Sequence, residues 1–282
     1  MNSECSIWRV LIFSVNFAPG YPRRYVATRK HKWSPMAGVP LGHFYAHLRF
    51  ETAVRHKNRF LLTPKTLEYA KWIAETAKAY STHEMKKDEV LYRARCHTAM
   101  PTDSQVPHLN DYKPKPYPKA EMGAPPSNLA TAGRLNPAGI PYLYAATDEL
   151  TAVAEARPWA GAWLSVAMFA FNRDVILIDA RMREEPDESQ DKSDPEIDKF
   201  WRLWRQLICW TFSLPHHPDD PSAYAPTQFL ASAFQHEGVD GIIYSSYLNS
   251  GGFNIALFDP EKADAKFVTQ KRVEAVNYTI AT

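Results

Sequence analysis

The amino-acid sequence predicts an α+β fold in which short strands pack with helices. Segments whose apolar residues recur at helical spacing alternate with apolar runs of strand length, which indicates mixed secondary structure. The expected strands are short, and no internal repeat is visible. We therefore favour an α+β arrangement over a doubly wound parallel sheet.

Size and composition are those of a globular protein of one or two domains. The chain has 282 residues, of which 45% are hydrophobic and 23% charged, and this excludes disorder or fibrous structure for most of it. Lys and Arg number 33 against 31 Asp and Glu, a net charge of +2. Such a balance provides no overall attraction to nucleic acid or to an anionic membrane, so neither is expected as a direct partner.

Cysteine usage and the early apolar run point to a cytoplasmic protein. Cys5, Cys96 and Cys209 lie far apart and form neither a CxxC pair nor a zinc-binding spacing with the histidines. A disulfide framework and a structural metal site are therefore not expected. The apolar run from Ile12 to Phe17 is too short for the core of a signal peptide or for a membrane span.

The first part of the chain differs from the rest. Basic residues crowd the segment 23–32, and a helix is predicted from Thr63 to about Tyr80, with Pro64 at its first position. We divide the chain into an N-terminal extension, residues 1–88, with a basic arm and helices, and a second domain, residues 89–282. The arm could contact a nucleic acid or an acidic partner, but a solvated tail is favoured.

The second domain begins with a strand and a proline-rich segment. A strand is predicted from Val90 to Cys96, and residues 98–128 are predicted to form an ordered loop or a lid, because dense prolines fix extended backbone and remove hydrogen-bond donors. A turn at residues 136–139 leads into a strand at 142–145.

A short helix and more strands follow. Thr147 is predicted to cap a helix that ends near Arg157. The apolar runs 163–171 and 175–179 suggest a buried hairpin, or neighbouring strands, turning at Asn172-Arg173. The remaining predictions are an acidic loop at 181–198, helices at 200–212 and 226–236, and strands at 241–246, 254–258 and about 265–276.

Familiar site motifs are absent. The chain has no GxGxxG, no GxxxxGK and no GxSxG. His216-His217 beside Asp219 and Asp220 raises a metal hypothesis, but adjacent histidines point in different directions, so a solvated loop is favoured and no metal site is predicted.

Four residues could contribute to a site, although each has an ordinary explanation. Arg93 lies in a strand that otherwise looks buried, so it needs an anionic partner, either a structural carboxylate or a ligand phosphate. Arg134 lies next to a turn and could project into a cleft or into solvent. Glu155 falls off the apolar stripe of its helix and could face a pocket or water. Ser246 ends an apolar strand, where either a site residue or a plain turn serine would fit.

The order of several blocks resembles the RES domain, the toxin family of RES–Xre toxin–antitoxin systems, which is named for its Arg, Glu and Ser. The blocks are LYRAR at 91–95, GRLNPAGIPYLYAA at 133–146, AVAEAR at 152–157, YAPTQ at 224–228, and DGIIYSS at 240–246 followed by NIALFDP. The resemblance covers roughly Glu89 to Pro260. Two positions depart from the family pattern: Leu135 replaces a tryptophan, and Tyr244-Ser245-Ser246 replaces Tyr-Pro-Ser, so Ser246 matches the family serine and Ser245 is its rival.

The resemblance implies an ADP-ribosyltransferase-like fold, with mainly antiparallel short strands and flanking helices, and cleavage of the nicotinamide–ribose bond of NAD⁺ by water or phosphate. NAD⁺ is then the substrate, phosphate is a potential co-substrate, and no prosthetic group or metal is needed. Carried onto this chain, the implied catalytic residues are Arg134, Tyr144, Glu155 and Ser246, and the implied NAD⁺-binding residues are Arg93, Asn136 and Gln228.

Two other functions and two partners stay open at this point. The same site could transfer ADP-ribose to a macromolecule, or the chain could be a non-catalytic binding module whose basic arm recruits a partner. The resemblance further implies neutralisation by a small Xre-like antitoxin. A homodimer is an additional possibility, and no membrane association is expected.

Overall fold

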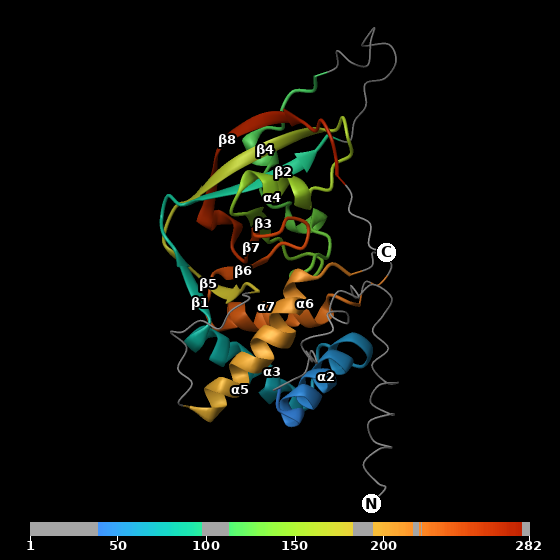
Figure 1. Cartoon of the computed structure of the whole chain (residues 1–282), viewed down its shortest axis with the longest axis vertical. Coiled ribbons are helices and arrows are strands. Elements are labelled where there is room, and N and C mark those ends of the chain that lie inside the picture. Colours follow the sequence, from blue (N-terminus) through green and yellow to red (C-terminus); the bar gives the residue numbers. More distant parts are fainter. Residues whose placement is uncertain (1–38, 98–112, 183–193, 217–219, 221, 278–282) are drawn as a thin grey trace, which may run out of the picture.

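One eight-stranded sheet forms the frame of the protein (Figure 1). The structure is a computed structural model that describes residues 39–97, 113–182, 194–216, 220 and 222–277. The strand order is β1-β5-β6-β7-β3-β2-β4-β8. Every neighbouring pair is antiparallel except β5 and β6, which are parallel. The predicted α+β fold with mainly antiparallel strands is therefore confirmed.

The strands lie close to the predicted positions, but one predicted pairing is wrong. Their bounds are β1 Thr82–Met85, β2 Val90–Cys96, β3 Leu143–Ala146, β4 Trp163–Phe171, β5 Val175–Ala180, β6 Gly241–Ser245, β7 Phe253–Leu257 and β8 Ala263–Arg272. β4 and β5 do not pair with each other, since β4 lies between β2 and β8 whereas β5 lies between β1 and β6. Apolar periodicity marks a strand but does not name its partner, and this explains the error.

The helix at 41–56 had no individual prediction within the expected helical extension, and the other helices differ from the predictions mainly at their ends. Their bounds are α2 Leu41–His56, α3 Pro64–Tyr80, α4 Glu149–Glu155, α5 Pro195–Leu203, α6 Cys209–Ser213 and α7 Ala225–His236. Residues Trp204–Ile208 form a π-helical turn that joins α5 to α6, and short 3-10 turns span Lys119–Glu121, Ser127–Leu129 and Pro260–Lys262.

Two helix starts correct the sequence analysis. The N-cap of α4 is Asp148 and not Thr147, because the Asp148 carboxylate accepts the N–H of Thr151. The helix predicted to begin at residue 200 begins at Pro195, where Asp194 caps it. In both cases aspartate is the capping side chain that satisfies a free N–H of the first turn.

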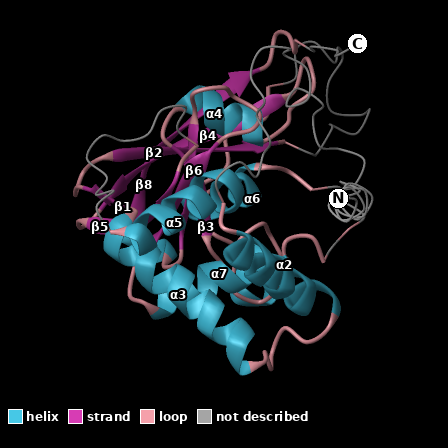
Figure 2. Cartoon of the chain, turned by 60° about the horizontal axis from the view of Figure 1, so that its bottom comes forward, coloured by secondary structure: helices cyan, strands magenta, loops and turns pink. Residues whose placement is uncertain are grey.

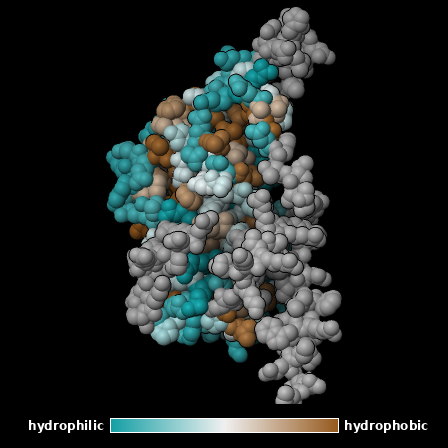
Figure 3. Space-filling view, viewed as in Figure 1, coloured by the Kyte–Doolittle hydropathy of each residue, from teal (hydrophilic) through white to brown (hydrophobic). Residues whose placement is uncertain are grey.

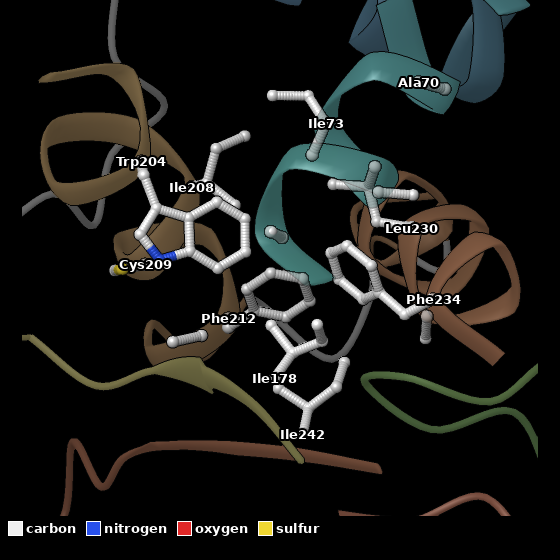
Figure 4. Packing of buried hydrophobic residues seen from close by; sticks show 14 of the residues in the cluster. Ala70, Ile73, Ile178, Trp204, Ile208, Cys209, Phe212, Leu230, Phe234 and Ile242 are labelled. Atoms are coloured by element: carbon white, nitrogen blue, oxygen red, sulfur yellow. The ribbon is translucent and has the colours of Figure 1, made fainter. Parts of the chain in front are cut away.

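The sheet separates two hydrophobic clusters. The larger one fills the space between one face of the sheet and the helices, and the smaller one covers the other face. Successive side chains of β6 point to opposite faces of the sheet: Ile242 and Tyr244 belong to the larger cluster, and Ile243 belongs to the smaller one. In Figure 4, side chains from α3, the α5–α6 segment and α7 meet two strand residues, Ile178 and Ile242.

The N-terminal helices are part of this larger cluster. Phe50 of α2 and Ile73 of α3 are fully buried in it, and Phe50 meets the Phe229 ring of α7 edge-on with 5.6 Å between centroids. Figure 2 shows α2, α3 and α7 side by side. The division of the chain near residue 88 stays a prediction, and the basic arm at 23–32 lies outside the described residues.

The surface in Figure 3 is mixed, with apolar patches between polar residues over the upper half of the view. Large exposed apolar side chains include Leu129, Leu150 and Trp159. In the part of the chain that the structure describes, no helix combines the length and the apolar character that crossing a bilayer requires.

Candidate active site

Glu155, the last residue of α4, carries the central carboxylate. Its Oε1 accepts two hydrogen bonds, from Ser246 Oγ at 2.7 Å and from Asn254 Nδ2 at 2.7 Å. No side chain or N–H of the described residues donates to Oε2. One oxygen is therefore fixed by two donors, and the other remains available as an acceptor.

The orientation of the Ser246 hydroxyl follows from its other bonds. Its Oγ accepts the N–H groups of Leu248 at 3.2 Å and Asn249 at 3.1 Å, so its own proton is directed to Glu155. The hydroxyl of Ser245 accepts the N–H of Met182 at 2.9 Å instead. Of the two candidate serines, only Ser246 contacts the Glu155 carboxylate.

The turn after β6 is attached to the start of α4. Asn249 Nδ2 donates to Thr151 Oγ1 at 2.7 Å, and Thr151 Oγ1 donates to the capping Asp148 at 2.6 Å. A β-carbon at Gly252 would collide with Thr151, so only glycine lets the turn come this close. Ser246 and Glu155, 91 residues apart in sequence, are held together by this attachment.

Arg134 lies on the face of the sheet that the helices cover. Its Nη1 donates to the carbonyls of Phe212 and Ser213, at 3.0 and 3.1 Å, which are unpaired acceptors at the end of α6. Its guanidinium carbon lies 5.4 Å from the ring centroid of Tyr244 and 6.0 Å from that of Tyr224. Burial acts to lower the pKa of Arg134, but these tyrosines and the Glu155 carboxylate outweigh it and hold that pKa above its ordinary value.

Tyr144 and Asn136 build the loop that presents Arg134. The Tyr144 hydroxyl donates to Asn136 Oδ1 at 2.8 Å and accepts the N–H of Leu135 at 2.9 Å. Burial is the main reason that the pKa of Tyr144 lies well above its ordinary value, so the hydroxyl stays protonated. Leu135, one of the two departures from the pattern that the resemblance implies, is fully buried. A side chain at Gly133 would collide with Asn136.

The amide group of Asn136 is fully engaged inside its own loop. Its Nδ2 lies within hydrogen-bond distance of the carbonyls of Thr131, Pro137 and Ile140. Gln228 of α7 likewise donates its Nε2 to the Gly133 carbonyl at 2.8 Å. Both residues hold the Arg134 loop, and direct contact of either with NAD⁺ stays a prediction.

Arg93 of β2 is a second half-buried cation, and it contacts the backbone of β3. Its Nη1 donates to the Tyr144 carbonyl at 3.1 Å. Burial, together with the nearby Arg95, lowers the pKa of Arg93 to about 10. Within the described residues neither Arg93 nor Arg134 forms an ion pair with a carboxylate. The sequence left two partners open for Arg93, a structural carboxylate or a ligand phosphate, and the described residues provide no such carboxylate. An anionic ligand could accept hydrogen bonds from both guanidinium groups.

Three members of this arrangement were missed by the sequence analysis. Asn254 anchors Glu155, and the rings of Tyr244 and Tyr224 border Arg134. All three occur inside the blocks that resemble the RES domain. Asn254 and Tyr244 lie in apolar strands and Tyr224 directly precedes α7, and none of these positions gives a sign by itself of what the side chain faces.

Elsewhere in the described part of the chain we searched for groups of side chains that could hold a metal ion. No group of three or more His, Cys, Asp and Glu side chains in the described ranges is arranged to hold a metal ion. In the loop considered for a metal, His217 and Asp219 lie outside those ranges. A cavity of about 460 Å³ is lined by Arg181, Ile243 and others, on the face of the sheet opposite Tyr244, and includes none of the predicted site residues.

Comparison with known proteins identifies the family. The model of the RES domain matches residues 108–280, so the chain belongs to the RES domain family. Among solved structures, it is similar to a chain in the crystal structure of the M. tuberculosis MbcT–MbcA toxin–antitoxin complex, with 14% identity and a TM-score of 0.38. That similarity covers 71% of this chain and 91% of the other. A search of curated proteins gave no match.

The two adjacent serines allow a matched test of the Glu155 anchor. Replacing Ser246 by alanine removes one of the two donors to Oε1. For the NAD⁺ cleavage that the family resemblance implies, we expect kcat to fall about tenfold, the effect of losing one hydrogen bond to a charged group. The Ser245→Ala variant should stay within about twofold of wild type, since Ser245 does not contact Glu155. Equal losses in both variants would contradict the assignment of Ser246.

Proposed function

We propose that this protein cleaves the nicotinamide–ribose bond of NAD⁺, with water or inorganic phosphate as the acceptor. The observation that carries the proposal is the Glu155 carboxylate, which Ser246 and Asn254 fix at Oε1 and whose charge acts on the half-buried Arg134. A second half-buried arginine, Arg93, bonds to the Tyr144 backbone, and neither arginine has a carboxylate partner in the described residues. A fixed negative charge near unpaired positive groups suits a substrate that combines a cationic ring with a pyrophosphate.

The carboxylate is matched to the charge that develops during bond cleavage. When the bond between the nicotinamide nitrogen and ribose C1 breaks, its electron pair leaves with nicotinamide, and positive charge grows on the ribose as in glycoside hydrolysis. Glu155 Oε2 stabilises that charge and orients the incoming oxygen. Because Ser246 and Asn254 already fix the carboxylate, little rearrangement is needed in the transition state.

The arginines bind the anionic part of the substrate. A guanidinium group can donate two parallel hydrogen bonds to a phosphate and stays charged, which suits the pyrophosphate of NAD⁺. Arg134 is presented by the Gly133–Asn136 loop. Arg93 of β2 donates to the carbonyl of Tyr144 in β3, and the hydroxyl of the same tyrosine accepts the Leu135 N–H of the loop. The half-buried Tyr144 ring is the proposed stacking surface for the nicotinamide cation.

The acceptor is identified from the products. The purified protein is incubated with NAD⁺ labelled in its adenine, with and without phosphate, and the products are separated. Water gives ADP-ribose and a proton, whereas phosphate gives ADP-ribose 1-phosphate, and both release nicotinamide. Label that appears on a protein or nucleic acid would favour ADP-ribose transfer instead. Unchanged NAD⁺ under all conditions would contradict the proposed function.

We further propose a protein partner that inhibits the enzyme. The family resemblance implies an antitoxin, and the similar solved chain was crystallised in a toxin–antitoxin complex. Loss of NAD⁺ cleavage on addition of a small Xre-like protein would support this partnership.

A further inference from the structure

The N-terminal helices contact the loop that leads into the candidate site. The match to the RES domain begins at residue 108, so α2 and α3 lie outside it. Nevertheless, both pack against α7. The first turn of α7 holds the Arg134 loop: Thr227 Oγ1 donates to the Arg134 carbonyl, and Gln228 to that of Gly133. A displacement of this turn would therefore move Arg134.

The most direct connection is one ion pair. Arg55, in the last turn of α2, donates from Nη2 to Asp220 Oδ2 at 2.8 Å, across 165 residues of sequence. Asp220 in turn accepts the N–H and the hydroxyl of Ser222, at 3.1 and 2.7 Å, in the turn that begins α7. The pair thus joins the end of α2 to the residues directly before Tyr224.

His216 lies beside Tyr224, the residue to which the ion pair leads. Its backbone N–H donates to the Tyr224 hydroxyl at 2.9 Å, and its ring meets the Tyr224 ring edge-on at 4.9 Å. On its other side, Tyr224 borders the Arg134 guanidinium. Burial, followed by the charges of Arg55 and Arg134, lowers the pKa of His216, so it is neutral at pH 7 and adds no positive charge between the two arginines.

We propose that Arg55 of the N-terminal part is a positioning residue of the active site: through Asp220 it holds Tyr224 against Arg134. The helices that precede the RES domain thereby become a component of the NAD⁺ site. The expected change in the KM for NAD⁺ rests on the proposed function. The placement of Tyr224 does not, because it can be measured without NAD⁺.

The test uses the full chain with Arg55→Gln, Asp220→Asn and the double variant. Arg49→Gln is the control, since Arg49 is an exposed arginine on the same helix whose described bond is to the Tyr45 carbonyl. The first readout is hydrogen exchange of the His216 amide, whose bond to Tyr224 reports the local structure. The second is the split between KM and kcat for NAD⁺.

We expect both single variants to speed exchange at the His216 amide and to raise the KM for NAD⁺ about two- to fivefold, the effect of a half-exposed ion pair, with kcat nearly unchanged. The double variant should resemble each single variant, because both remove the same contact. Arg49→Gln should match wild type.

Unchanged exchange at His216 in both single variants would overturn the inference, whatever the activity of the wild type. An unchanged KM in an active enzyme would overturn it too. If the wild type leaves NAD⁺ intact while exchange still responds, the proposed function fails and the placement of Tyr224 by Arg55 stands.

Discussion

Replacing Glu155 by glutamine is expected to lower the kcat for NAD⁺ cleavage by about a hundredfold to a thousandfold, the effect of removing one group that stabilises transition-state charge. Glutamine has nearly the same shape, and its carbonyl oxygen can still accept the hydrogen bonds of Ser246 and Asn254. The change therefore removes the negative charge and keeps the local contacts. The measurement is the rate of nicotinamide release at saturating NAD⁺, together with a thermal unfolding curve.

Glu149 offers a matched control for this variant. It lies in the first turn of the same helix and pairs with Lys271 at 2.9 Å, near the surface. We expect Glu149→Gln to retain wild-type activity, because this carboxylate is not part of the Glu155 arrangement. Full activity in the folded Glu155→Gln variant would remove Glu155 from the chemistry.

Replacing Arg134 by lysine is expected to raise the KM for NAD⁺ about tenfold to a hundredfold, which corresponds to losing one charged hydrogen bond of roughly 1.5–3 kcal/mol. A lysine carries the charge but cannot offer two parallel donors to a phosphate. It also cannot contact the Phe212 and Ser213 carbonyls in the geometry of the guanidinium group. The effect should be larger on KM than on kcat, and steady-state kinetics separate the two.

Arg202 on α5 is the control, since it is exposed and pairs with Asp198 on its own helix. Arg202→Lys should leave KM unchanged. An unchanged KM in a folded Arg134→Lys variant would mean that Arg134 serves only to cap the end of α6, and the anion-binding role would have to move to another residue.

Local chemistry allowed much of the fold to be predicted. The strand at 90–96 and the helix that begins at Pro64 were predicted correctly, because residues that divide between two sides over a strand length and an N1 proline are direct signals. The pairing of β4 with β2 and β8 could not be predicted, because it depends on contacts between segments far apart in sequence. The first strand, β1, has only four residues and was missed for want of a pattern.

The candidate site shows the same limit. Glu155 and Ser246 could be selected from the family resemblance, and the structure places them in contact. The part played by Asn136 could not be foreseen, because its polar atoms are consumed by carbonyls that the folded loop brings around it. Asn254 gave no signal, since its neighbours in β7 are apolar and its partner lies 99 residues away.

The release of nicotinamide from NAD⁺ by the purified chain tests the central claim most directly. Wild-type protein is incubated with NAD⁺ beside the Glu155→Gln and Glu149→Gln variants, and free nicotinamide is quantified over time. The account predicts steady release by wild type and Glu149→Gln, and a rate lower by about two orders of magnitude for Glu155→Gln. Equal release by all three proteins, or none by the wild type, would contradict it.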